Sequence, residues 1–169
     1  MPDPKQHSED RNFVEDILRH IPGFKGYLEK EYRRESDQLA RTWLADQLQR
    51  GKQGLSEYGR VLLDSAQIDA LADIDRLNSR LDRAISRLRG QMPGYSGFFD
   101  YVRINEDDLN DAYEHDMQLM ELVKQLAGRL EALPEDSGPP SVILRDVLGQ
   151  VDKVLKEIDK REEILAGLN

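Results

Sequence analysis

The 169-residue sequence contains no cysteine. This absence excludes disulfide bonds, zinc sites built from thiolates and any cysteine nucleophile, and it leaves nothing that favours an oxidising compartment. The fold must therefore be held by a packed core. A chain of about 150 residues buries roughly two thirds of its unfolded surface, so we expect a domain that is stable without crosslinks.

The sequence also lacks any run of about 18 consecutive apolar residues, which a membrane-spanning helix would need. Residues 1–7 are polar and do not resemble the apolar core of a signal peptide. We therefore predict no membrane span and a cytoplasmic location. Peripheral membrane contact stays open because residues 8–21 have the pattern of an amphipathic helix, although the acidic residues on its polar face would be repelled by anionic lipid.

Basic residues are too few for a typical nucleic-acid-binding protein. Lysine and arginine number 24 against 33 aspartates and glutamates, which gives a net charge of −9. Binding to nucleic acid usually requires a basic face that displaces counterions from the phosphates. Acidic residues interrupt the local basic clusters at residues 33–34 and 80–89. We therefore predict no nucleic-acid partner.

Helical periodicity dominates what the sequence does contain. Charged residues make up 34% and hydrophobic residues 38%, a balance typical of amphipathic helices with solvated outer faces. Apolar spacing predicts a short helix that begins near Ser8, followed by four long helices, with residues 1–7 as a flexible tail. We therefore expect an all-α fold, an antiparallel up-down-up-down four-helix bundle with a short extra N-terminal helix, in a single domain over residues 8–169.

The end of the first long helix can be placed at two sites. Gly51 and Gly54 fit a helix C-cap, whereas a reversal at residues 64–67 would let the helical spacing continue past both glycines. We favour the glycines slightly. The next helix, over residues 68–89, has a heptad pattern with Asn78 on its apolar seam, where a polar residue commonly determines register at some cost in stability.

Two further boundaries are marked by local signals. Asn105 is a good N-cap, and the acidic residues 106–108 that follow it favour the positive end of a helix. Residues 133–140 are rich in proline and glycine, so we expect them to separate this helix from a last one over residues 141–168.

The longest non-helical stretch, residues 94–102, concentrates the aromatic residues. Following the helix directions places it at the same end of the bundle as the Pro-Gly turn at residues 21–27. Glycine permits close backbone approach and aromatic side chains are common binding anchors, so this end is a candidate partner-binding surface. The same residues could instead form a hydrophobic plug, and the sequence leaves both open. The candidate residues are Phe24, Tyr27, Tyr95, Phe98, Phe99 and Tyr101.

A buried polar layer is expected about 15 Å inside that end, or about ten residues along each helix. The residues expected at this depth are Glu35 on the first long helix and residues 78–83, 115–116 and 157–161 on the other three. Buried carboxylates need partners, so we expect Asp116 to pair with Arg34 or Arg83, and His115 to point to the side or to solvent. The Glu-x-x-His spacing of di-metal bundles is absent, so we predict no metal, no cofactor and no catalytic residue. The candidate layer residues are Glu35, Asn78 and Asp116.

Two segments resemble those of a group of small bacterial helical proteins. One is IPGFKGYL at residues 21–28, followed by Arg33, Arg34 and Asp37. The other is GYSGFFD at residues 94–100, followed by Tyr113, Glu114 and Asp116. The resemblance would span most of residues 13–165. That group is uncharacterised, so the resemblance implies a soluble bacterial helical protein and carries over no activity.

These observations favour a non-catalytic helical-bundle protein that acts by binding another protein or a second copy of itself. The first alternative is a bundle enzyme that binds a metal or small ligand through the buried carboxylate layer. The second alternative is a peripheral membrane-stress adaptor that uses the helix at residues 8–21.

Overall fold

The computed structural model describes residues 4–27, 30–90 and 106–167, and the secondary structure of these residues consists of helices, without a strand. The helices within these ranges are α1 (Pro4–His20), α2 (Lys30–Asp64), the short 3₁₀ helix η1 (Ile68–Ala70), α3 (Leu71–Arg89), α4 (Glu106–Ala132), the 3₁₀ helix η3 (Leu133–Glu135) and α5 (Pro140–Gly167). Within the described ranges, none of the helices has the length and apolar character that crossing a membrane requires.

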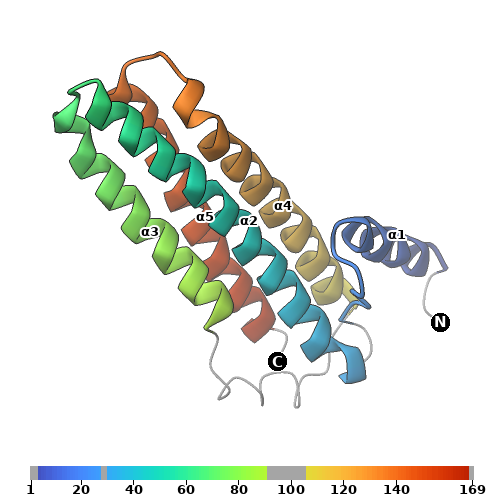
Figure 1. The fold of residues 1–169 in the computed structure, drawn as a ribbon. Coiled ribbons are helices and arrows are strands. Elements are labelled where there is room, and N and C mark those ends of the chain that lie inside the picture. The colour runs from blue at the N-terminus through green and yellow to red at the C-terminus, as the bar shows by residue number, and fades with distance from the viewer. Residues whose placement is uncertain (1–3, 28–29, 91–105, 168–169) are drawn as a thin grey trace.

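The four long helices lie side by side, and we call α2–α5 the helical body (Figure 1). α2 packs against α3 and α4, and α5 packs against the same two helices. The α2–α3 and α4–α5 connections lie at one end of the body, while α1 projects from its side near the other end (Figure 1). α1 packs on α4.

Leucine and valine side chains fill the space between the long helices. Burying one such side chain stabilises the fold by about 1.5–3 kcal/mol, so the apolar stripes of the sequence account for most of the packing energy. Representative core residues, all almost inaccessible to solvent, are Leu44, Leu48, Leu55, Leu77, Leu81, Leu119, Val123, Val147, Val151 and Val154.

α2 continues for 35 residues through Gly51 and Gly54, so the prediction that it ends at these glycines is wrong. Both glycines face α4 at close range. A Cβ atom on Gly54 would lie 2.3 Å from the backbone oxygen of Leu130, and one on Gly51 would lie 2.8 Å from the Cδ1 atom of Leu130. Glycine is therefore needed here for close helix packing, and not for a helix end.

The alternative reversal at residues 64–67 is confirmed. The amide of Gln67 donates to the carbonyl oxygen of Leu62 at 2.8 Å, and that of Ala66 to Leu63 at 3.1 Å. Ala66 has a φ angle of 59°. This is the Schellman arrangement that often ends a helix, with alanine in the left-handed position that glycine usually occupies.

The other helix boundaries differ little from those expected. α1 begins at Pro4, so the backbone of residues 4–7 is helical where we expected a flexible tail. Proline suits the first turn of a helix because its missing amide proton has no helical acceptor there. α4 begins at Glu106, directly after the predicted N-cap Asn105, and α5 spans Pro140–Gly167 against an expected 141–168.

Candidate functional site

A group of charged and phenolic side chains is buried near the end of the helical body where α2 and α4 begin and α5 ends. We call Tyr27, Asp37, Asp116 and Arg161 the polar cluster. All four are buried, and they come from the α1–α2 loop, α2, α4 and α5. A buried charge is costly unless it is paired and hydrogen-bonded, so the partners of each group decide what the cluster can do.

Arg161 lies at the centre of the polar cluster. Its Nε donates to Asp116 Oδ1 at 2.7 Å, and its Nη2 donates to the hydroxyl oxygen of Tyr27 at 3.1 Å. The same Nη2 lies 2.7 Å from Asp37 Oδ1, an ion-pair contact without the alignment of a hydrogen bond. The Tyr27 hydroxyl donates to Asp116 Oδ2, so both oxygens of Asp116 accept hydrogen bonds.

A second arginine completes the charge balance. Arg41 Nε donates to Asp37 Oδ2 at 2.9 Å, and Arg41 Nη1 donates to the carbonyl oxygen of Leu88 in the last turn of α3 at 3.0 Å. Two carboxylates therefore face two guanidinium groups, and the network joins all four long helices. Charge-assisted hydrogen bonds of this kind are about twice as strong as neutral ones.

The loop before α2 closes over the polar cluster. The rings of Tyr27 and Tyr113 stack with centroids 5.4 Å apart, and the rings of Phe24 and Tyr27 make an edge-to-face contact with centroids 5.5 Å apart. The amide of Tyr27 donates to the hydroxyl oxygen of Tyr113 at 2.7 Å. Gly26 has a φ of +86°, and a Cβ atom there would lie 2.5 Å from that hydroxyl oxygen, so only glycine fits.

Two more side chains satisfy the polar backbone groups of this loop. The buried Arg33 donates from Nε to the carbonyl oxygen of Tyr27. The buried hydroxyl of Ser36 accepts the amide of Lys25 at 3.0 Å. The loop is therefore attached to α2 by hydrogen bonds and to α4 by ring stacking. It is as much part of the core as the helices are.

Of the six predicted partner-binding residues, the structure describes two, Phe24 and Tyr27. Phe24 is 2% exposed and Tyr27 is 0% exposed, so these two residues form part of a plug and offer no surface to a partner. Their burial corrects the prediction that they bind a partner directly. Tyr95, Phe98, Phe99 and Tyr101 lie outside the described residues, and their role stays a prediction.

Of the three predicted layer residues, Asp116 alone belongs to the polar cluster. Glu35 is exposed, because the neighbouring Ser36 and Asp37 occupy the inward face of α2. Asn78 is half-buried on α3 and takes no part in the hydrogen bonds described above. Leu77, the residue before it, is the fully buried one.

The expected partners of Asp116 are also corrected. Arg34 and Arg83 are both exposed, and Arg161 binds Asp116 instead. Arg161 lies within the range expected at this depth, but sequence spacing does not say which of several arginines turns inward. Sequence reasoning gave Asp37 and Ser36 no role either, because short polar residues on a charged helix are usually solvated.

His115 is buried, contrary to the expectation that it points to the side or to solvent. Its side chain is 4% exposed, and its Nε2 lies 2.9 Å from Glu157 Oε2 on α5. Among the described residues, its Nδ1 atom has no hydrogen-bond partner. The pair adds a second polar link between α4 and α5.

The surroundings of Tyr27 and Arg161 hold the protonation states of these two side chains constant. Burial raises the pKa of the Tyr27 hydroxyl well above its ordinary value, and the carboxylate of Asp116 raises it further. For Arg161, burial by itself lowers the pKa, but Asp116 and Asp37 outweigh it and the net shift is upward. Tyr27 therefore stays a neutral donor and Arg161 a cation at neutral pH. Neither is tuned to exchange protons there, which a general acid or base must do.

Asp116 is equally unsuited to hold a cation. Its two oxygens accept from Arg161 and Tyr27, so a metal ion would have to displace a guanidinium group. Among the residues that the structure describes, no three or more histidine or acidic side chains are grouped as metal ligands would be. The geometry of the polar cluster is that of a buried ion-pair and hydrogen-bond network that holds the helices together.

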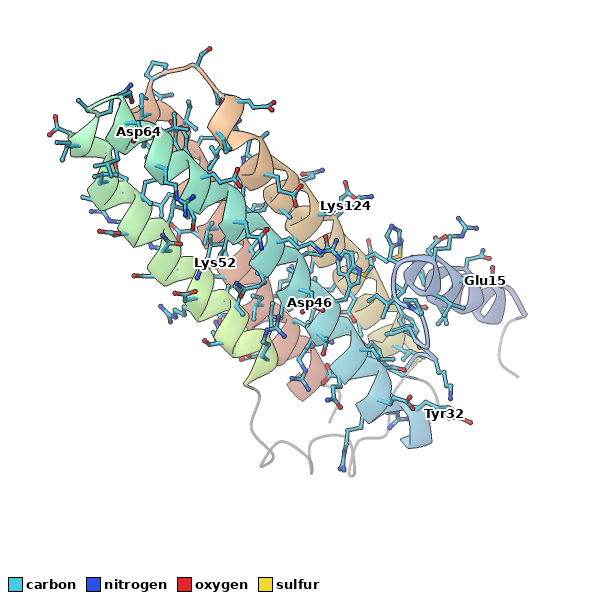
Figure 2. The ribbon with its side chains drawn as sticks, viewed as in Figure 1. Glu15, Tyr32, Asp46, Lys52, Asp64 and Lys124 are labelled. Carbon is cyan, nitrogen blue, oxygen red and sulfur yellow. The ribbon has the colours of Figure 1, made fainter. Side chains whose placement is uncertain are left out.

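The opposite end of the helical body has a different character. Val61 and Leu63 of α2, Ile68 of η1 and Val142 of α5 are all exposed there, with Leu63, Ile68 and Val142 at 57%, 63% and 62%. We call these four residues the apolar end. It includes four of the five large apolar side chains that are exposed in the described chain, the fifth being Leu18 on α1. Figure 2 labels Asp64 at this end.

Sequence reasoning did not identify the apolar end. Its residues stand beside buried positions in the sequence, so a helical pattern does not distinguish them from core residues. The signal that could have found them is the position of each residue in the first or last turn of its helix, where the neighbouring helices stop.

No protein-family model, curated protein or solved structure matches this chain, so the comparisons name no family to which the chain belongs.

Proposed function

We propose that the protein is a non-catalytic helical bundle that acts by binding another protein through the apolar end. In this proposal, α2–α5 form an antiparallel up-down-up-down four-helix bundle and α1 is the extra helix. The packing of α2 and α5 on the same two helices, α3 and α4, supports that arrangement.

The buried polar groups are paired with one another, and this pairing supports a binding role over a catalytic one. Arg161, Asp116 and Tyr27 satisfy one another, and His115 is engaged by Glu157. A catalytic group must contact its substrate, whereas these groups are buried between helices. The carboxylate-layer enzyme therefore lacks two of the features it would need, an inward Glu35 and an Asp116 with free oxygens.

The membrane-adaptor alternative has little support from α1. Its Ile17 is buried, and Phe13 and Val14 are half-buried against the core. Leu18, at 44% exposure, is the one large apolar residue of the described part of α1 that is exposed to solvent. The apolar face of this helix is therefore used within the protein and is not free to enter a lipid surface.

The observation that carries the proposal is the exposure of the apolar end. Four of the five large apolar side chains that are exposed in the described chain lie at this one end of the helical body. Exposed apolar side chains that are concentrated in one region commonly mark an interaction site, whereas scattered single ones are ordinary. Removing three mostly exposed side chains, those of Leu63, Ile68 and Val142, from water would favour association by the hydrophobic effect. The rest of the surface is rich in charged residues, which are depleted in the centres of interfaces.

Site-specific photo-crosslinking in the native cell would test the proposal. A photoreactive amino acid placed at Ile68 should crosslink to a defined partner. The same amino acid at the exposed Lys153 of α5 is the control. A crosslink to a second copy of the chain would identify the partner as the protein itself, and light scattering on the purified protein would then show the oligomer.

A paired substitution makes the test specific. Leu63→Ser with Val142→Ser, on the chain that carries the photoreactive group at Ile68, should abolish the crosslink while the melting temperature stays close to that of the parent. The matched control Leu18→Ser removes the exposed apolar residue of α1 and should leave the crosslink unchanged. An equal yield of the same product from Ile68 and Lys153, or a crosslink that survives the paired substitution, would refute the proposal.

A further inference from the structure

An open groove lies between α1, α2 and α4 and shares no lining residue with the polar cluster or the apolar end. Its volume is about 180 Å³. The apolar side chains that line it are Ile17 of α1, Trp43 of α2, and Met117 and Met120 of α4. Ile17 and Met120 are buried, while Trp43 and Met117 are half-buried and reach the opening. α1 thus forms one wall of the groove, and α2 and α4 form its floor.

The lining of the groove suits an aromatic ring. Trp43 already makes an edge-to-face contact with the His20 ring, with centroids 6.2 Å apart and the planes at 80°. Aromatic rings prefer such edge-to-face or offset contacts, and methionine sulfur interacts favourably with ring edges. A cavity of about 150 Å³ lined by apolar side chains is known to hold benzene, so a groove of this size accepts a molecule with a single ring.

The charges at the rim indicate what that ring should carry. Asp16 faces Arg19 at 3.5 Å, and Glu121 accepts a hydrogen bond from Gln125 Nε2 at 3.1 Å. His20 Nδ1 contacts the carbonyl oxygen of its own helix at Asp16. The formal charges of Asp16, Arg19, Glu121 and Lys124 at the rim sum to zero. The ammonium group of Lys124 is the one charged group among them without a partner among the described residues. Figure 2 shows Lys124 on the outer side of α4.

We propose that this groove is a binding site for a small aromatic carboxylate, with its ring against Trp43 and its carboxylate on Lys124. The carboxylate provides the ion-pair partner that Lys124 lacks, and the ring covers the apolar side chains of the groove. The inference is independent of the proposed function, because the groove and the apolar end share no residue.

Trp43 is the single tryptophan of the chain, so its fluorescence reports on the groove directly. Titration with phenylacetate should change the emission in a saturable way, with a Kd on the order of 1 mM or lower, as expected for a molecule of so few atoms. The neutral analogue 2-phenylethanol, with the same ring, should bind about tenfold more weakly, because it makes no charge-assisted contact. Acetate should give no saturable change.

Two further measurements locate the site. Lys124→Gln should weaken phenylacetate binding to the level of 2-phenylethanol, whereas the matched control Lys153→Gln on α5 should leave it unchanged. Both lysines are exposed, so neither substitution should disturb folding. In a protein with labelled methionine methyl groups, phenylacetate should shift the signals of Met117 and Met120, and acetate should leave both unchanged.

Three results would overturn the inference. The first is the absence of saturation in the millimolar range, and the second is equal affinity for phenylacetate and 2-phenylethanol. The third is a Lys124→Gln variant that binds phenylacetate as well as the parent protein does. A loss of crosslinking at Ile68 would not bear on these results, so the two proposals fail separately.

Discussion

Replacing Gly54 by alanine should destabilise the protein, although alanine is the better helix former. Gly54 lies within α2, where alanine would normally stabilise the helix by about 1 kcal/mol. The new Cβ atom, however, would lie 2.3 Å from the carbonyl oxygen of Leu130 and 2.7 Å from Glu131 Cα. Both are backbone atoms of α4, so neither can move aside by a side-chain rotation.

The magnitude follows from these opposing terms. Ordinary carbon contacts lie at about 3.5–4.0 Å, so the two helices must separate by roughly 1 Å at their closest point. Inserting one carbon into a packed core typically costs about 1–3 kcal/mol, and a clash between two backbones belongs at the upper end. We expect a net loss of about 2 kcal/mol, which corresponds to a fall of about 4–8 °C in the melting temperature for a domain of this size.

Three other glycines provide matched controls on the same scale. Gly128 of α4 and Gly149 of α5 have open space where a Cβ atom would go, so alanine there should raise the free energy of unfolding by up to about 1 kcal/mol. Alanine at Gly51 would meet the Cδ1 atom of Leu130 at 2.8 Å, and that side chain can shift. Its effect should fall between the two extremes.

Urea unfolding followed by circular dichroism would measure all four variants. The expected order of stability is Gly128→Ala and Gly149→Ala above the parent, Gly51→Ala near it, and Gly54→Ala clearly below. A Gly54→Ala protein as stable as the parent would refute the reasoning that close packing of α2 on α4 requires glycine. So would the same loss at Gly128, because it would show that the cost does not come from contact between helices.

Other positions lead to equally specific expectations. Arg161→Met should lower the free energy of unfolding by about 3–5 kcal/mol, because it leaves a buried carboxylate without its counter-charge; adding Asp116→Asn should recover part of that loss in a double-mutant cycle, and strictly additive losses would refute the pairing. Ala66→Gly should stabilise the protein by about 1 kcal/mol, because glycine adopts the left-handed conformation without a steric penalty; an unchanged urea midpoint would contradict this. Stability should fall above a pH of about 10, where the unfolded chain releases the Tyr27 proton and the folded protein keeps it, since burial and then Asp116 raise the pKa of Tyr27 in the fold. Urea unfolding at several pH values should show a shallower alkaline decline for Tyr27→Phe, and an identical decline would show that Tyr27 contributes nothing.

The helices were predictable because their signals are local. Asn105 and the acidic residues after it predicted the start of α4 within one residue. The heptad pattern predicted α3, although Leu77 takes the inward position that we assigned to Asn78. A heptad allows neighbouring positions to share the seam, and the larger apolar side chain is the one that becomes buried.

The glycines of α2 show where local reasoning failed. Glycine ends many helices, so the sequence slightly favours a C-cap at Gly51 and Gly54. Their actual role depends on the backbone of α4, which is distant in sequence. The real end of α2 has alanine in the left-handed position, a choice that propensity alone would not select.

The polar cluster shows the same division between what local sequence signals predict and what depends on packing between helices. Sequence spacing placed Asp116 at the right depth, and the need for a counter-charge predicted an arginine partner. Which arginine turns inward depended on how four helices rotate against one another. Glu35 and Asp37 are two residues apart, so a helix rotation of about 200° separates the exposed carboxylate from the buried one.

By itself, the sequence determined that the protein is all-α and where most of its helices begin and end. Those properties follow from apolar spacing, caps and turn residues, which act over a few residues of chain. The tertiary structure alone decided that Arg161 neutralises Asp116 and Asp37, that Phe24 and Tyr27 are buried, and that Leu63, Ile68 and Val142 stay exposed. These depend on contacts between segments far apart in the chain, and their energies are settled only when the helices pack.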